Sequence, residues 1–159
     1  MPNLNYLDPY PRGWSNPVTA RASAILTAAW DVAPTEFFCS GAEWMRLQFT
    51  YTRGAAGGAF DFQIESSIYS VAALVPAGAG AWADPTVEAV GAVVAGADTQ
   101  SLIQDGYDTF ESGGAAAETA TYGPVQLNKT LERIRIPCRE SADGVVGSPG
   151  TLQVTAELW

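Results

Sequence analysis

The sequence EWMRLQFTYTR, residues 43–53, decides the fold class because its apolar and polar side chains alternate along the whole stretch. The residues that point to one side are Met45, Leu47, Phe49 and Tyr51, and those that point to the other are Trp44, Arg46, Gln48, Thr50 and Thr52. A period of two residues is typical of a β-strand with one face in a core and the other toward solvent.

A second alternating stretch follows directly, after the glycine-rich tract Gly54–Gly58. Its apolar residues are Phe60, Phe62 and Ile64, its polar ones are Asp61, Gln63 and Glu65, and it continues to Val71. Two such strands joined by a short loop predict a β-hairpin. In that arrangement, the polar residues of the second strand form a solvated face.

Further strand-like segments occupy the rest of the chain. We expect strands at Thr19–Trp30, at Phe37–Phe38 before Cys39, at Val87–Val94, at Val125–Arg139 and at Thr151–Trp159. In Val125–Arg139, the residues Ile134, Ile136 and Cys138 face one side and Arg133 and Arg135 the other; in the last strand, Leu152, Val154, Ala156 and Leu158 share one face. Residues Ser101–Asp108 fit either a helical turn or a strand, and Gly113–Ala117 and Ser141–Gly150 read as loops.

These segments predict an all-β protein, because no long amphipathic helix interrupts them. We expect a single β-sandwich or jelly-roll-like domain over residues 19–159. Since the last strand reaches Trp159, it is expected to be an integral member of a sheet.

The composition excludes several classes of function. The chain has 159 residues, 17 acidic and 8 basic side chains, a net charge of −9 and no histidine. This length fits one domain. Without histidine, neither a Ser-His-Asp nor a Cys-His nucleophile system can form, nor any His-ligated metal site. Without a cluster of bases, binding to nucleic acid or to anionic lipid is not expected.

The first 18 residues differ from the rest and predict an extended N-terminal arm. They contain four prolines, which disfavour helix and central strand, together with Tyr6, Tyr10 and Trp14. The arm either folds back on its own domain or grips a neighbouring subunit. The segment has no signal-peptide pattern, and no apolar stretch approaches the about 20 residues of a membrane span. We therefore expect synthesis in a cytoplasm.

The acidic residues do not predict a catalytic or metal site. Asp61 and Glu65 are four residues apart on one strand, which places them about 13 Å apart, whereas catalytic carboxylate pairs lie roughly 5–9.5 Å apart. A second acidic cluster comprises Asp98, Asp105, Asp108 and Glu111. Its spacing is not that of an EF-hand calcium loop, so no metal and no other cofactor is expected.

The basic residues and glycine tracts also favour structural roles. Lys129, Arg133 and Arg135 are expected on one face of a strand, paired with acids of a neighbouring strand or subunit. The tracts Arg53–Gly58 and Gly91–Ala97 lack the phosphate-loop and dinucleotide-binding patterns.

Tryptophans and cysteines each leave two alternatives. The five tryptophans are Trp14, Trp30, Trp44, Trp82 and Trp159. They fit packing in a core or subunit interface, but Trp44 falls on the polar face of its strand, where it could stack on a sugar ring. Cys39 and Cys138 fit two buried free thiols, or a disulfide, because both lie at the ends of strand-like runs.

The segments NLNYLDPYPRGWSNPVTA (residues 3–20) and EWMRLQFTYTRGAAGGAFDFQIESS (residues 43–67) carry a resemblance of organisation. An aromatic, proline-rich arm before a compact acidic β-domain resembles the capsid decoration, or cement, proteins of tailed bacteriophages, and the Ala/Gly/Arg bias suggests a GC-rich or thermophilic host. The resemblance implies a virion structural protein on the capsid surface, made in the host cytoplasm, without enzymatic activity or cofactor.

The resemblance also implies partners and contact residues. A homotrimer would bind the major capsid protein and tie capsomers together through its arms, with Tyr6, Tyr10, Arg12 and Trp14 as the gripping residues. The alternatives are a carbohydrate-binding β-sandwich module, another virion protein of the tail or neck, and a hydrolase whose fold brings two carboxylates together.

Overall fold

The computed structural model describes residues 17–54, 58–69, 106–112, 117–141 and 149–159, and in these residues it contains strands and no helix. The ten strands are β1 (Val18–Ile25), β2 (Glu36–Phe38), β3 (Trp44–Thr52), β4 (Ala59–Phe62), β5 (Glu65–Ser67), β6 (Asp108–Glu111), β7 (Ala117–Gln126), β8 (Arg133–Arg135), β9 (Cys138–Glu140) and β10 (Thr151–Leu158). The prediction of an all-β fold is confirmed.

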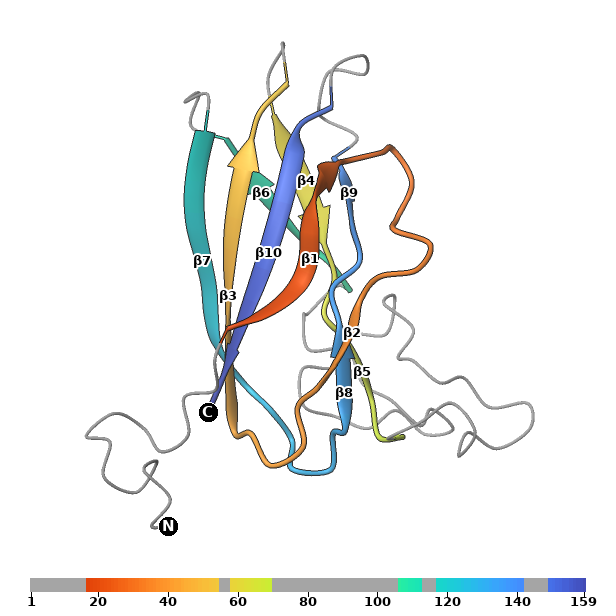
Figure 1. Cartoon of the computed structure of the whole chain (residues 1–159), viewed down its shortest axis with the longest axis vertical. Coiled ribbons are helices and arrows are strands. Elements are labelled where there is room, and N and C mark those ends of the chain that lie inside the picture. Colours follow the sequence, from red (N-terminus) through yellow and green to blue (C-terminus); the bar gives the residue numbers. More distant parts are fainter. Residues whose placement is uncertain (1–16, 55–57, 70–105, 113–116, 142–148) are drawn as a thin grey trace.

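The first layer is a four-stranded antiparallel sheet with the order β1-β10-β3-β7 (Figure 1). The C-terminal strand β10 lies between β1 and β3, so it is the integral sheet member that the sequence predicts. Strand β7 forms one edge of this sheet and β1 the other.

The second layer consists of two three-stranded sheets, β2-β8-β5 and β6-β4-β9, which share one continuous ladder. Phe62 pairs with Cys138 and Glu65 with Arg135, so the register is the same on both sides of the break. At the break itself, the N–H of Gln63 donates to the carbonyl of Pro137 at 3.0 Å. Since proline has no N–H to donate, the ladder is interrupted there but keeps its register.

The strand pairs are nested in chain order, which identifies the sandwich as a jelly roll. Strand β1 pairs with β10, β2 with β8, β3 with β7, and β4 with β6. If β4–β5 and β8–β9 each count as one interrupted strand, the described residues form eight strands in two layers. This is the double-sheet jelly-roll arrangement that the sequence predicts.

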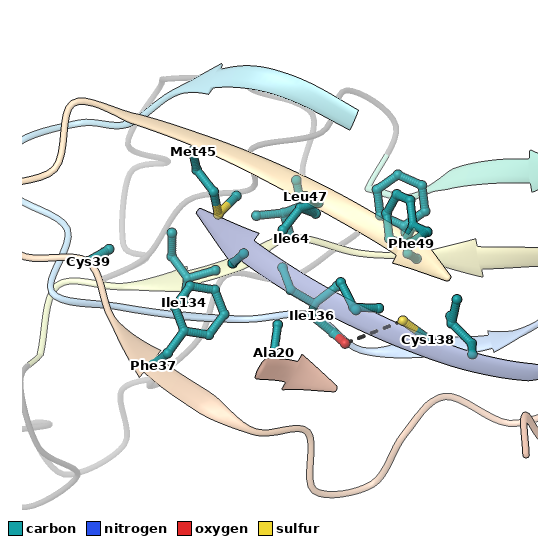
Figure 2. Packing of buried hydrophobic residues seen from close by; sticks show 14 of the residues in the cluster. Ala20, Phe37, Cys39, Met45, Leu47, Phe49, Ile64, Ile134, Ile136 and Cys138 are labelled. Carbon is teal, nitrogen blue, oxygen red and sulfur yellow. Dashed lines mark hydrogen bonds between the residues drawn. The ribbon is translucent and has the colours of Figure 1, made fainter. Parts of the chain in front are cut away.

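The core lies between the two layers (Figure 2). Its fully buried side chains include the alternating apolar residues of β3 and β10, and they meet those of the second layer. The second layer contributes Phe60, Phe62, Ile64, Ile134, Ile136 and Cys138.

The predicted hairpin between the strands of residues 43–53 and 59–71 is wrong, because β3 and β4 belong to different layers. Their apolar faces meet across the core instead: the Phe49 ring lies 5.2 Å from that of Phe60 and 4.7 Å from that of Phe62. An alternating pattern shows only that one face of a strand is buried. It does not distinguish a neighbouring strand in the same sheet from a strand in the opposite layer.

The predicted single strand Val125–Arg139 is also wrong. Strand β7 starts at Ala117, inside an expected loop, and ends at Gln126. A turn follows, in which Asn128 Oδ1 accepts the N–H of Thr130 at 3.0 Å. Strands β8 and β9 then follow on either side of the break at Pro137.

Strand β1 ends at Ile25 and not at Trp30, as the sequence had predicted. The N–H of Leu26 still bonds to Gly150 at 2.9 Å, and the chain then crosses to the second layer, where the N–H of Asp31 bonds to Cys138 at 3.0 Å. Of the segment Ser101–Asp108, the last residue begins β6. The expected strand Val87–Val94 lies outside the described residues.

Candidate functional site

The outer face of the second layer carries a row of arginine–carboxylate pairs. Arg133, Arg135 and Arg139 alternate with buried residues of β8 and β9, so they point away from the core. Each has an acid from a neighbouring strand as its partner. The pairs are Arg133 Nη1 with Glu36 Oε2 at 2.5 Å, Arg135 Nε with Glu65 Oε2, and Arg139 Nε with Asp61 Oδ2 at 2.8 Å. The pairing of Arg133 and Arg135 with acids of neighbouring strands is confirmed.

The expected solvated face of Asp61, Gln63 and Glu65 is wrong, because all three residues are buried. Asp61 is only 2% exposed; its carboxylate accepts hydrogen bonds from Arg139 and, at 2.8 Å, from Thr109 Oγ1. A carboxylate can be buried when a guanidinium and further donors compensate its lost hydration. The paired arginines therefore explain why these polar side chains are not on a solvated face.

Two aromatic rings cover the Arg139 guanidinium. Its Cζ lies 4.3 Å from the centre of the Trp30 ring and 5.4 Å from that of Tyr107, which are distances of cation–π contacts. The chain next to Trp30 is held in place by Asp31, whose carboxylate accepts the Arg21 Nε–H at 2.9 Å and the Cys138 N–H at 3.1 Å. Trp30 is thus a structural residue.

The outer face of the first layer has a different chemistry. Its register positions carry uncharged polar side chains, namely Gln48, Thr50 and Thr52 on β3, Gln153 and Thr155 on β10, and Thr119 and Thr121 on β7. Arg46 and Glu157 lie opposite each other on this face, and Arg46 Nε donates to Glu157 Oε2 at 2.9 Å. The charges of this pair cancel, so these positions together form a neutral face.

Trp44 and Trp159 lie side by side at one end of this neutral face. The N–H of each donates to the carbonyl of the other, at 3.0 and 3.1 Å, and both residues are half-buried. The sequence places Trp44 on a polar face but gives no sign of its neighbour. Finding it would have required the register between β3 and β10, which alternation alone does not determine. Trp14 and Trp82 lie outside the described residues.

The two cysteines are buried free thiols at separate places in the core (Figure 2). The possible Cys39–Cys138 disulfide is therefore not formed. Burial raises the pKa of the Cys39 thiol to about 12, and burial raises that of Cys138 as well. Because the thiolate is the reactive form, neither cysteine has the character of a nucleophile.

Several other predicted residues have different outcomes. The arm residues Tyr6, Tyr10, Arg12 and Trp14, with Asp98 and Asp105, lie outside the described residues. Asp108 and Glu111 lie on β6, and the described part of the chain holds no group of three or more side chains suited to a metal ion. Lys129 does not share the face of the arginines, because it lies in the turn after β7 and pairs with Glu43 at 2.8 Å.

Of the glycine tracts, Gly58 has a steric role. A Cβ atom there would lie 2.5 Å from the Tyr51 hydroxyl. Positions 55–57 and 91–97 lie outside the described residues.

No helix among the described residues is long and apolar enough to cross a membrane. Comparisons with protein-family models, curated proteins and solved structures found no match.

Proposed function

We propose that the protein is a structural component of a tailed-phage virion that binds the outside of the capsid without enzymatic activity. The observation that carries the proposal is the nested pairing of β1 with β10, β2 with β8, β3 with β7, and β4 with β6. Viral capsid domains use the double-sheet jelly roll, although lectins and other proteins use it too.

The distribution of charge supports a structural role. The acids on the outer face of the second layer are neutralised by arginines, and the outer face of the first layer is neutral. The described carboxylates Asp61 and Glu65 are thus held by ion pairs, which suits rigidity better than proton transfer.

The position of β1 supports a role for the N-terminal residues. Val18 pairs with Ala156, so residues 1–17 join the domain at the end of the first sheet where Trp44 and Trp159 lie. In this proposal, residues that include Tyr6, Tyr10, Arg12 and Trp14 contact the major capsid protein or a second subunit. Buried aromatic area there would offset the loss of conformational entropy.

Deletion of residues 1–16 tests the proposal. The truncated protein is expected to keep its β circular dichroism spectrum but to lose binding to capsids of the phage that encodes it, measured by co-sedimentation. Unchanged binding would contradict the role of the N-terminal segment. Mass spectrometry of virions tests the rest: a copy number near that of the major capsid protein fits decoration, whereas a few copies fit the tail or neck. A trimer would have a solution mass near 50 kDa, three times 16.7 kDa.

A second candidate function is carbohydrate binding, which the adjacent Trp44 and Trp159 favour. Two half-buried indoles beside the Gln126 amide and the Arg46–Glu157 pair offer both stacking and hydrogen bonds to a sugar. A glycan array followed by fluorescence titration tests it. Trp44→Ala should abolish glycan-dependent quenching, while Trp30→Phe, a change in the other layer, should preserve it.

A further inference from the structure

Strand β7 exposes a long edge whose main-chain groups are available for pairing. It spans Ala117–Gln126 at the end of the first sheet, and in the described residues no strand lies along its outer side (Figure 1). The opposite edge strand β1 has two register shifts against β10, while β2 and β6 are short. Among the described edges, β7 is therefore the best template for another strand.

The direction of the β7 main-chain groups follows from two sets of hydrogen bonds. Trp44 exchanges bonds with Trp159 of β10, while the Glu43 carbonyl accepts from Leu127, just beyond β7. In an antiparallel sheet, successive residues of a strand bond alternately to the two sides. Odd-numbered residues of β3 therefore bond to β7, and their partners there include Ala120, opposite Phe49.

The residues between those partners point their N–H and C=O groups outward. Thr119 lies opposite Thr50 and Thr121 opposite Gln48, so their main-chain groups face the free edge. Both residues are exposed, and so is Ala117. Toward the end of the strand, Gly123 has a φ of +110° and lies in a bulge against β3, which limits the regular edge to residues 117–122.

The sequence of this edge is compatible with itself in antiparallel orientation. We propose that two copies of the chain pair through β7 about a twofold axis at Ala120, which extends the first sheet across the dimer. Thr119 of one copy then exchanges main-chain hydrogen bonds with Thr121 of the other, as an isologous contact requires. Cross-strand Thr–Thr pairs are favourable.

Charge explains why a second copy fits this edge. Each chain carries a net charge of −9, so two copies associate where like charges are not brought together. Within the regular edge, the charged residue is Glu118, which the twofold axis places opposite Tyr122 and not opposite its own copy. Self-pairing of β6 would bring Asp108 opposite Glu111. The inference does not depend on the virion role, but on a shell the same contact would join neighbouring copies laterally.

Light scattering of the full chain at several concentrations, with two variants of one residue, tests the proposal. Thr121→Pro removes an outward N–H, which an edge strand tolerates, and it should halve the particle mass of the wild type. Thr121→Val changes the side chain but keeps the N–H, and it should leave the mass unchanged.

Two further variants keep the test decisive if Thr121→Pro does not fold. The double change Thr119→Lys/Thr121→Lys keeps every N–H but opposes like charges across the axis, and it should also halve the mass. Ala120→Pro removes an N–H directed at β3 and should lower the urea midpoint of unfolding. A wild type that is monomeric throughout, or an oligomer whose mass the folded proline and lysine variants leave unchanged, would overturn the proposal.

Discussion

The outer faces of the two layers solve the same problem in opposite ways. On the second layer, Asp61 and Glu65 are buried beside arginines of β8 and β9. On the first layer, neutral side chains such as Thr50 and Gln153 occupy the exposed face, with one partly exposed pair, Arg46–Glu157. The difference teaches that an ion pair in this fold is structural where it is buried. Where it is half-exposed, it serves to keep a surface neutral.

The largest effect is expected from removing Arg139. Arg139→Ala leaves the Asp61 carboxylate, whose side chain is 3% exposed, without its guanidinium partner. Leaving one charge of a buried pair uncompensated costs about 3–5 kcal/mol of unfolding free energy, which urea denaturation measures. The control Asp61→Asn/Arg139→Met removes both charges and should recover most of that loss. A loss below about 1 kcal/mol for Arg139→Ala would mean that the pair behaves like a surface pair.

Alkaline pH should weaken the core between the two faces. The pKa of Cys39 rises from 9.0 to about 12 in the folded protein, and burial also raises the pKa of Cys138. The folded state therefore keeps protons that the unfolded state loses. Stability is fully present below about pH 8 and falls as the pH rises from about 9 toward 12, by at most about 1.4 kcal/mol per thiol and pH unit.

Urea midpoints measured across this alkaline range test the expectation. The control Cys39→Ala/Cys138→Ala should flatten the slope. Some slope should remain, because burial also raises the pKa of Tyr51 and of Tyr122. An identical slope in the wild type and in the control would show that the thiols do not contribute.

A smaller loss is expected where the layers close around Tyr51. A Cβ atom at Gly150 would lie 2.4 Å from Cε2 of the Tyr51 ring, so Gly150→Ala forces this buried ring to move. Overpacking of this kind costs about 1–3 kcal/mol. A double-mutant cycle with Tyr51→Leu is the check, because alanine at position 150 should cost less once the ring is gone. An equal cost in both backgrounds would assign the effect to the backbone.

The comparison of the two faces also shows how far the sequence could lead. The alternation of Met45, Leu47 and Phe49 is sufficient to predict a half-buried strand, and repeated patterns of this kind predict an all-β fold. The partner of each strand does not follow, since pairing with a neighbour and packing across the core bury the same residues. Phe60 and Phe62 were therefore placed in a hairpin, although they face Phe49 from the opposite layer.

The candidate site was harder to predict for a related reason. Arg139 and Asp61 are 78 residues apart, and only the register between β4 and β9 makes them partners. Without that register, a polar residue on an alternating strand is assigned to solvent, as Asp61 was. The adjacency of Trp44 and Trp159 was missed in the same way, because it depends on the pairing of β3 with β10.

The smallest effect is expected from Arg46, the counterpart of Arg139 on the first layer. The side chains of Arg46 and Glu157 are 41% and 24% exposed, so water already solvates much of the pair. Arg46→Ala should therefore cost only about 0–1 kcal/mol, and added salt should reduce even that difference by screening. The measurement is the same urea titration as for Arg139→Ala, at low and high ionic strength. If Arg46→Ala cost as much as Arg139→Ala, the two faces would not differ in the way that burial predicts, and Arg46 would have to be counted among the residues that hold the sheets together.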